Sequence, residues 1–564
     1  MSEGGGLGVR EVTGRDALIE LLLDEGVDLM FGNPGTTELP LMEAVARYPR
    51  FRYVLGLQEA SAMAMAEGFA RASGRLVACN LHCMPGLGNA MGALYSAKFS
   101  GAPVIVTAGQ YPQGHGLTEP MLYEPLVPIA APLVKWSAEV TRLEDLPRIL
   151  RRAAKLALTP PMGPVFISLP GDVLDAKATI DLGRPTRVET ASPPSARVLD
   201  AMVAALLGAE RPAIIAGREL AERDAFEQAQ ALAERLGAAV YRESVPYNAR
   251  FASTHRAFMG ELGRDQRRVR DTLAAHDLVL CLGADMLRMS LESEIDPLPP
   301  GLRVLHLSER DWELAKNYPV ELAVRADVRE SLDALLPLLD DAAPSAFRAA
   351  AAARLDEIAS RNWSARLAAA PAAGRGSGAM APAAAMAALT ASLPPDAIVV
   401  EEALTATPAL MASLRTEDRH GYYGLASGGL GFAVPGAVGI SFAHPDRPVV
   451  AVVGDGSSLY SVQGMWTAAH FRRPVTFVIV NNRSYRIIKE RLVALRGTDR
   501  FTAMDLRDPA IDFMALARGF GLSAARVTDA AEVGAAIRDA IASGAPSLIE
   551  LVVADGFDAG AAAQ

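Results

Sequence analysis

Short apolar runs rich in β-branched residues alternate with amphipathic, Ala- and Leu-rich segments along almost the whole chain. In the first third, residues 27–35 (VDLMFGNPG) predict a strand that runs into a turn, and residues 59–74 (EASAMAMAEGFARASG) predict a helix. This alternation is typical of parallel sheets whose strands are joined by crossover helices. We therefore predict an α/β fold.

The α/β pattern occurs in three blocks, separated by two stretches of different composition. The first joint is Pro-rich and polar (TASPPSAR, residues 190–197), and the second is Ala-rich with Pro and Gly. A chain of 564 residues exceeds what one hydrophobic core usually organises. We predict three doubly wound parallel-sheet domains and one linker with a helix inside it, with the boundaries 1–189, 190–340, 341–380 (linker) and 381–564.

Composition and charge narrow the classes of function. The net charge is −10 and the chain has no long basic tract, so we predict no binding to nucleic acid or to an anionic membrane. Cys79, Cys83 and Cys281 match neither a disulfide framework nor a zinc site. The uncharged stretch 424–443 contains repeated glycines and Pro435, which favour a buried loop and helix over a membrane span. No secretory signal is visible at the start, and we expect a cytoplasmic protein.

Two polar residues in the third block each follow an apolar run that predicts a strand. Residues 447–453 (RPVVAVV) lead to Asp455, and residues 474–480 (PVTFVIV) lead to Asn482. Because a βαβ unit returns its second strand parallel to the first, the carboxyl ends of neighbouring strands would lie about 5 Å apart. Ligands bind α/β sheets at those ends, and carboxylate and amide oxygens suit Mg²⁺. We predict that the two side chains bind one Mg²⁺ ion.

The residues around this pair suit a diphosphate. Gly454 and Gly456 let the backbone approach a phosphate closely. Ser457, at the start of the next predicted helix, adds a backbone N–H and a hydroxyl. Residues 454–485 (GDGSSLYSVQGMWTAAHFRRPVTFVIVNNRSY) resemble the diphosphate and metal motif of thiamine-diphosphate enzymes. The resemblance implies that the cofactors are thiamine diphosphate and Mg²⁺.

This resemblance also implies a role for individual residues. Asp455, the side chain of Asn482 and the backbone carbonyl of Ser484 would be the protein ligands of the metal. Tyr485 and Thr405 would lie beside the diphosphate, and a packing role for either residue stays open.

The first block carries an independent match. Residues 31–40 (FGNPGTTELP), 55–60 (LGLQEA) and 80–94 (NLHCMPGLGNAMGAL) resemble the cofactor-activating domain of benzoylformate decarboxylases, in order and at similar spacing. Residues 422–439 (YYGLASGGLGFAVPGAVG) fit the same family. The resemblance implies that the three blocks are a pyrimidine-binding, a middle and a diphosphate-binding domain.

The same motifs imply an activating glutamate and its neighbours. Glu59 would lie against N1′ of the cofactor's aminopyrimidine, where sharing a proton activates the thiazolium C2. Leu430 would hold the cofactor bent, and Gly428 would offer it a backbone carbonyl. His82 matches an active-site histidine, and Thr36 keeps a hydroxyl that can bind a substrate carboxylate. Structural roles stay open for these residues, such as core packing for Leu430.

Several positions depart from the benzoylformate decarboxylase pattern. Ser290 stands where a second catalytic histidine is expected, and serine cannot act as an acid near neutral pH. His115 is a candidate substitute, with a solvated loop histidine as the alternative. Ile487 replaces a small residue, which should narrow an aryl pocket. Arg486 and Lys489 either attract an acidic substrate or form a solvated helix face.

The leading prediction is a thiamine-diphosphate-dependent 2-oxo-acid decarboxylase, with carboligation as a side or main activity. Its substrate would be a small-molecule 2-oxo acid or aldehyde. The alternative is a transferase resembling acetolactate synthase, a family that holds FAD in its middle domain. The middle block shows no glycine fingerprint that would cradle a phosphate, so FAD is not predicted. A binding protein on the same fold would be expected to lose Glu59 or the metal pair.

The resemblance also implies an assembly. It places the cofactor between the first block of one subunit and the third block of its partner. We therefore expect a homodimer or a homotetramer.

Overall fold

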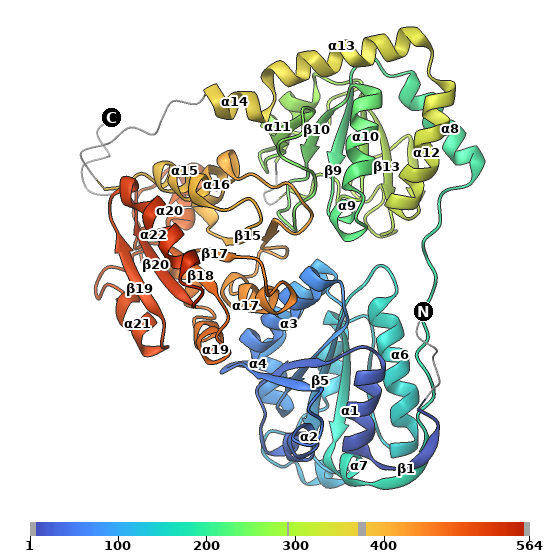
Figure 1. Cartoon of the computed structure of the whole chain (residues 1–564), viewed down its shortest axis with the longest axis vertical. Coiled ribbons are helices and arrows are strands. Elements are labelled where there is room, and N and C mark those ends of the chain that lie inside the picture. The colour runs from blue at the N-terminus through green and yellow to red at the C-terminus, as the bar shows by residue number, and fades with distance from the viewer. Residues whose placement is uncertain (1–6, 290–292, 370–378, 558–564) are drawn as a thin grey trace. The chain divides into compact units, whose positions relative to one another are not determined.

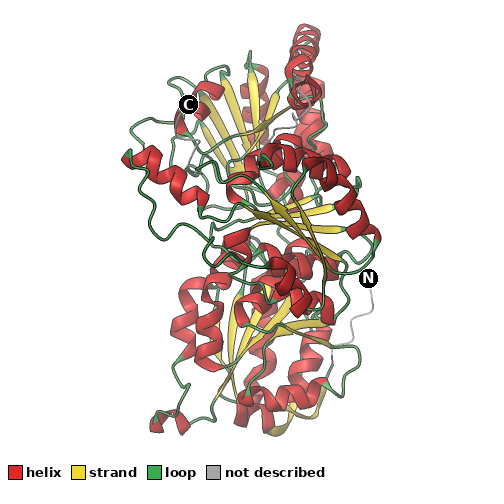
Figure 2. Cartoon of the chain, turned by 90° about the vertical axis from the view of Figure 1, so that its left-hand side faces the viewer, coloured by secondary structure: helices red, strands yellow, loops and turns green. Residues whose placement is uncertain are grey.

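The computed structural model describes residues 7–289, 293–369 and 379–557 (Figure 1). The chain divides into two compact units. Unit 1 comprises residues 1–188, 376–407 and 425–564, and unit 2 comprises residues 189–375 and 408–424. The strands of the sheets, yellow in Figure 2, are flanked by helices.

The first sheet of unit 1 is parallel and has the strand order β3-β2-β4-β5-β7-β6. Its strands are β2 (Leu29–Gly32), β3 (Arg52–Leu55), β4 (Val77–Leu81), β5 (Val104–Gln110), β6 (Ser137–Glu139) and β7 (Val165–Pro170). Its main helices are α1 (Gly14–Asp24), α3 (Glu59–Ser73), α4 (Cys83–Ser100) and α6 (Leu146–Leu158). The strand order reverses between β2 and β4, and ligands bind doubly wound sheets at such a reversal point.

Five strands of the third sheet also belong to unit 1, in the order β15-β17-β18-β20-β19, and all pair in parallel. They are β15 (Ile398–Glu402), β17 (Val449–Gly454), β18 (Val475–Asn481), β19 (Ser523–Val527) and β20 (Ser547–Val552). Helices around them include α15 (Pro382–Ser392), α17 (Ala433–Ala443), α19 (Gly464–His470), α20 (Arg486–Arg496), α21 (Phe513–Gly519) and α22 (Ala530–Ala542). Here the reversal point lies between β15 and β17.

The sheet of unit 2 has the order β11-β10-β9-β12-β13-β14 and reverses between β9 and β12. Its strands are β9 (Pro212–Ala216), β10 (Ala239–Arg242), β11 (Phe258–Glu261), β12 (Leu278–Leu282), β13 (Arg303–Ser308) and β14 (Leu322–Arg325). The helices of unit 2 include α8 (Ala196–Leu207), α9 (Glu219–Glu222), α10 (Phe226–Leu236), α11 (Gln266–Leu273), α12 (Val328–Ala342), α13 (Ser345–Arg361) and α14 (Trp363–Ala369).

Within unit 1, helices α3 and α17 pack against each other at very short range. A Cβ at Gly68 would lie 2.3 Å from the carbonyl oxygen of Gly436, and a Cβ at Gly439 would lie 1.9 Å from that of Met65. Glycine is therefore required where the two backbones meet. This contact explains the run of small residues that made residues 424–443 resemble a membrane segment. Among the described residues, no helix is long and apolar enough to cross a membrane.

The predicted α/β architecture with three doubly wound sheets is confirmed. Two details differ from the sequence analysis. The helix predicted to start at Ser457 is divided in two, because Asp455–Ser458 form one short helix and Gly464–His470 form α19. The strands β1 (Val9–Thr13) and β8 (Lys177–Asp181) were not predicted, and they pair antiparallel across more than 160 residues of sequence.

Candidate active site

Asp455 and Asn482 leave neighbouring strands at the same edge of the third sheet, as the sequence predicts. In the parallel register of β17 and β18, Gly454 lies opposite Val480, so the chain beyond each strand emerges at one place. Asp455 begins the short helix α18 (Asp455–Ser458), and Asn482 directly follows β18. The expected pair of oxygen donors is therefore brought together.

The side chain of Asp455 is buried and incompletely hydrogen-bonded. Its Oδ1 accepts the backbone N–H of Gly456 at 2.9 Å, whereas its Oδ2 has no hydrogen-bond partner among the described residues. Burial raises the pKa of Asp455 to about 6, although the nearby backbone N–H groups of Gly456, Arg483 and Ser484 lower it. A buried carboxylate oxygen without a donor is unfavourable, and a cation beside Oδ2 would remove that penalty. The site therefore fits a divalent metal ion.

Buried ionic contacts fix the loop that follows β18. The side-chain oxygen of Asn482 accepts the N–H of Ser484 at 2.9 Å, and the Ser484 hydroxyl donates to Asp555 at 2.5 Å. Lys489 donates to Asp555 at 3.0 Å and to Asp505 at 2.8 Å, and it is only 2% exposed. The expectation of a solvated helix face is therefore wrong for Lys489, because two carboxylates hold its ammonium group inside the protein.

Three of the residues expected beside a diphosphate, Gly456, Ser457 and Tyr485, lie in or against α18. A Cβ at Gly456 would lie 2.5 Å from a ring carbon of Tyr485, so glycine is required beneath that ring. Ser457 is buried in α18, and Thr405 lies in the 3-10 helix Leu404–Ala406 that follows β15. Within residues 7–289, 293–369 and 379–557, no group of three or more His, Cys, Asp or Glu side chains could hold a metal. The expected set agrees with this, because it contains one carboxylate, one amide and one backbone carbonyl.

Gly428 and Leu430 lie in the turn that precedes α17. Gly428 and Gly431 have φ angles of +79° and +105°, which favour glycine. Gly428 is exposed and Leu430 is half-buried in the isolated chain. Ordinary core packing therefore does not account for Leu430.

Glu59 is the first residue of α3. Its Oε2 accepts a hydrogen bond from the side-chain amide of Asn89 at 3.0 Å. A Cβ at Gly86 would lie 3.4 Å from its Oε1. The carboxylate of Glu59 therefore rests on one face of α4, which carries both Gly86 and Asn89.

His82 lies at the reversal point of the first sheet, directly after β4. Its Nδ1 is 2.9 Å from Oε2 of Glu38 and 3.1 Å from the hydroxyl of Thr37. The buried Glu38 carboxylate also accepts the backbone N–H groups of Gly35 at 2.8 Å and Gly109 at 2.9 Å. An acceptor at Nδ1 fixes the ring and leaves Nε2 for proton exchange.

The sequence analysis missed Glu38 and Thr37. The available signal was the spacing within NPGTTE, because a glutamate three residues after a helix-initiating residue often turns back to the start of the helix. Here the backbone N–H of Gly35, which precedes the 3-10 helix Thr36–Glu38, donates to the Glu38 carboxylate. This geometry aims the carboxylate at the backbone and at the imidazole of His82.

The other two expected catalytic residues, Thr36 and His115, are exposed in the isolated chain. Thr36 is exposed, and the hydroxyl that contacts His82 belongs to Thr37. His115 begins an exposed 3-10 helix (His115–Thr118), where its ring meets Tyr111 edge-on at 5.5 Å. Ser290 lies outside the described residues. The roles of Thr36 and His115 remain predictions.

At the reversal point of the unit 2 sheet, polar groups of the protein form hydrogen bonds with one another. The carboxylate of Glu243 accepts the backbone N–H of Arg218 at 2.8 Å on Oε1 and that of Asp285 at 3.1 Å on Oε2. The N–H of Gly217 donates to the carbonyl of Leu282 at 2.9 Å. A Cβ at Gly217 would lie 2.2 Å from the carbonyl oxygen of Gly283, the residue that follows Leu282. Backbone groups of the protein therefore satisfy both oxygens of the buried Glu243 carboxylate at this reversal point.

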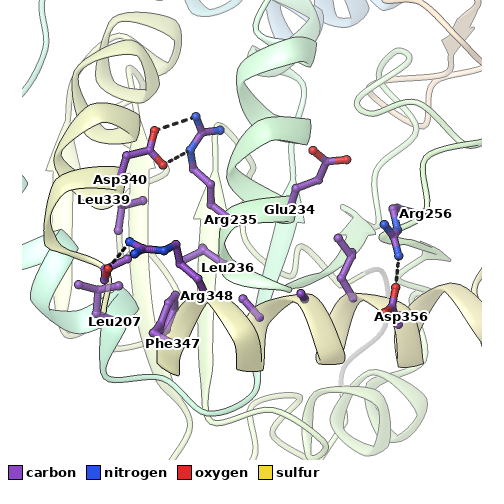
Figure 3. A pocket seen from close by; sticks show the side chains of 14 residues that line it. Leu207, Glu234, Arg235, Leu236, Arg256, Leu339, Asp340, Phe347, Arg348 and Asp356 are labelled. Atoms are coloured by element: carbon purple, nitrogen blue, oxygen red, sulfur yellow. Dashed lines mark hydrogen bonds and ion pairs between the residues drawn. The ribbon is translucent and has the colours of Figure 1, made fainter. Parts of the chain in front are cut away.

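A separate cavity of about 330 Å³ lies among α10, α12 and α13 of unit 2 (Figure 3). Arg235 binds Asp340 through two hydrogen bonds of 2.7 and 2.9 Å, and Arg256 pairs with Asp356. Apolar side chains such as Leu236, together with Glu234 and Arg348, form the rest of the lining. The cavity contains none of the expected cofactor or catalytic residues.

Three family models match the chain. They describe the N-terminal TPP binding domain, the central domain and the C-terminal TPP binding domain of the thiamine pyrophosphate enzymes, and they match residues 12–121, 199–335 and 407–551.

The chain is similar to several other proteins over nearly its full length. A benzoylformate decarboxylase from Pseudomonas aeruginosa is 33% identical, with 96% of this chain and 98% of that protein covered. An acetolactate synthase large subunit from Parasynechococcus marenigrum is 29% identical, with 97% and 88% covered. The solved structure of a thiamine diphosphate-dependent 4-hydroxybenzoylformate decarboxylase from Rhodococcus jostii superimposes with a TM-score of 0.85 at 32% identity, covering 96% of this chain and 99% of that one. Benzoylformate decarboxylase from Polynucleobacter necessarius gives a TM-score of 0.86 at 29% identity, with the same coverage.

Proposed function

Because this chain belongs to the thiamine pyrophosphate enzymes, we propose that it is a Mg²⁺-dependent lyase that decarboxylates a 2-oxo acid. The observation that carries this proposal is the buried Oδ2 of Asp455, which has no donor among the described residues and lies beside the Asn482 loop. A metal ion and a diphosphate would complete this site. Similarity to benzoylformate decarboxylases along 96% of the chain supports the reaction class.

The metal and diphosphate end of the site would be held by the third sheet. The Asp455 carboxylate, the Asn482 amide oxygen and the Ser484 carbonyl would bind Mg²⁺, which usually completes its six oxygen ligands with phosphate and water. Tyr485 and Thr405 would border the diphosphate. The contacts of Ser484 with Asp555 and of Asn482 with the Ser484 N–H hold two of the three metal ligands in place before the ion binds.

The reacting end would be served by the first sheet. Thiamine diphosphate, when bound, would supply a nucleophilic carbon for a ketone carbonyl and a thiazolium ring that can act as an electron sink during decarboxylation. Glu59 would hold a proton at N1′ of the aminopyrimidine, and Asn89 keeps one of its two oxygens occupied. His82 would exchange a proton through Nε2, because its Nδ1 already contacts Glu38. Thr36 would bind the substrate carboxylate, and His115 is the candidate for a second acid.

An acetolactate synthase-like transferase is the second candidate, since such enzymes are also similar over nearly the full length. The unit 2 sheet favours the decarboxylase. That sheet would be the place for a flavin dinucleotide, and at its reversal point Glu243 already accepts the backbone N–H groups of Arg218 and Asp285. We therefore propose that the enzyme works without a flavin.

The surface of α4 supports the proposal of a homodimer or homotetramer. Five of its six exposed positions are uncharged and fall on one helical face, namely Pro85, Gly88, Asn89, Gly92 and Tyr95, and the sixth is Lys98. Nothing lies within 4 Å of a Cβ built at Gly92, so a second backbone can approach closely. Sedimentation of the purified protein would test this. A fully active monomer would contradict it.

The state of the cysteines supports the proposal of a cytoplasmic location. All three are buried and unpaired, which agrees with a reducing cytoplasm.

The reaction is tested by incubating the purified protein with thiamine diphosphate and Mg²⁺ against a panel of 2-oxo acids, with and without an acceptor aldehyde. Release of carbon dioxide and an aldehyde is the expected result, and Ile487 should disfavour the bulkiest aryl substrates. Acetohydroxy acid formation without free aldehyde would favour the transferase instead.

A further inference from the structure

Strand β15 ends in two consecutive buried glutamates, Glu401 and Glu402, which are 2% and 1% exposed. Successive side chains of a strand point to opposite faces of the sheet. The two carboxylates therefore reach different loops from one rigid strand.

The carboxylate of Glu402 binds the turn that carries Leu430. Its Oε1 accepts the backbone N–H of Gly431 at 2.7 Å, and its Oε2 accepts those of Phe432 and Ala433 at 2.9 and 2.8 Å. Three donors on one carboxylate fix both the end of the turn and the start of α17. Among the described contacts, no backbone N–H from Gly428 to Leu430 donates to a buried carboxylate.

The carboxylate of Glu401 binds the other loop of interest. Its Oε1 accepts the N–H of Ala403 at 2.6 Å and the hydroxyl of Thr407. These contacts flank the 3-10 helix that contains Thr405. Leu404 in this helix has a φ of +48°, a strained value for a residue with a side chain, and such strain persists only where surrounding contacts hold it.

We propose that the two carboxylates at the end of β15 position both cofactor loops. Glu402 fixes the position of the turn that carries Gly428 and Leu430. Glu401 fixes the position of the 3-10 helix that carries Thr405. This inference rests on the proposed function, because it assigns the two loops to the thiazolium and pyrimidine end and to the diphosphate end. Glu402 is a positioning residue, since it acts through the backbone of residues 431–433 and not on the reacting atoms.

The direct test compares two ligands for two variants in the full-length protein with Mg²⁺. Glu402→Gln replaces one acceptor oxygen by an amide that faces backbone N–H groups. Its affinity for thiamine diphosphate should fall by about tenfold or more, as expected for loss of hydrogen bonds to a charged group. Its affinity for inorganic pyrophosphate, which has no rings, should stay within about twofold. Glu401→Gln should weaken both ligands.

Glu25→Gln is the matched control. Glu25 is a buried carboxylate of unit 1 that binds Arg151 at 2.8 Å and Arg187 at 2.6 Å, at neither cofactor loop. This variant should lower the unfolding temperature and leave both affinities unchanged. If Glu402→Gln does not fold, Glu402→Asp keeps the charge but shortens the reach, and it should show the same split between the two ligands.

A second readout needs no cofactor. Amide hydrogen exchange of the segment around residues 431–433 should accelerate in Glu402→Gln and not in Glu25→Gln. Wild-type affinity for thiamine diphosphate in a folded Glu402→Gln protein would overturn the inference, and so would an equal loss of pyrophosphate affinity. A wild-type protein that binds no thiamine diphosphate would contradict the proposed function itself, and unchanged amide exchange in Glu402→Gln would then refute the anchoring contact separately.

Discussion

The third sheet of unit 1 and the sheet of unit 2 share a doubly wound topology but differ at their reversal points. In the third sheet, a buried oxygen of Asp455 has no hydrogen-bond donor among the described residues. In unit 2, both oxygens of Glu243 accept backbone N–H groups. One reversal point is incomplete without a ligand, and the other is completed by the protein.

This difference shows that topology identifies where a ligand can bind, while hydrogen bonding decides whether one is needed. Both carboxylates are buried and both have raised pKa values, to about 6 for Asp455 and about 8 for Glu243, chiefly because of burial. Only the carboxylate with an unsatisfied oxygen gains from a cation. The predictions below test this contrast.

The largest effect is expected for Asp455→Asn. The amide removes the charge that attracts Mg²⁺ and places N–H donors beside the ion, so metal affinity should fall by more than about 100-fold. Titration with Mg²⁺ followed by protein fluorescence would measure this. The reference is Glu243→Gln, which should bind Mg²⁺ like the wild type, and equal losses in both variants would break the comparison.

The next effect is expected for Glu59→Gln. The variant keeps the shape of the side chain but cannot share a proton in the same way, so turnover should slow by about 10²- to 10⁴-fold. Mg²⁺ binding should be nearly unchanged, because the proposed metal ligands follow strands of the third sheet. Steady-state kinetics and Mg²⁺ titration check both statements, and wild-type turnover would show that Glu59 is not the activating group.

A smaller effect, on stability alone, is expected for Glu243→Gln. One of its two backbone donors would face an amide N–H₂ and lose its acceptor, which costs about 1–3 kcal/mol of unfolding free energy. Denaturant unfolding at pH 9, above the raised pKa of Glu243, measures this. Cofactor affinity should be unaffected, and a loss of thiamine diphosphate binding would indicate that unit 2 takes part in the cofactor site.

The smallest effect is the pH dependence of stability. Burial raises the pKa of Glu243 to about 8 and that of Glu219 to about 7, above the ordinary glutamate value. Between the ordinary value and these raised values, the folded state holds more protons than the unfolded state, so the free energy of unfolding should decrease as the pH rises. Each group contributes at most about 1.4 kcal/mol per pH unit. Between pH 5 and 8, the free energy of unfolding should therefore decrease less steeply with pH in Glu243→Gln than in the wild type. Identical slopes would refute the assignment.

Much of the fold was predictable because its signals are local. Apolar runs and helical periodicity define each βαβ unit, and the parallel rule for such units placed Asp455 and Asn482 at one sheet edge. The motif around Glu59 was likewise readable within a few residues. These features need only neighbouring sequence.

The missed features depend on contacts between distant residues. Glu38 meets His82 across 44 positions and the Gly109 N–H across 71. Lys489 is buried by Asp555, which lies 66 positions away, so its helix face looked solvated in the sequence alone. Glu402 reaches Gly431 across 29 positions. Such carboxylates are ordinary strand or turn residues until the fold brings their donors to them.

The central claim is tested most directly by calorimetric titration of the purified chain with thiamine diphosphate, with and without Mg²⁺. The account predicts saturable binding at one site per chain that requires Mg²⁺ and is lost in Asp455→Asn. No binding by the wild type in the presence of Mg²⁺, or equal binding by the variant, would contradict it.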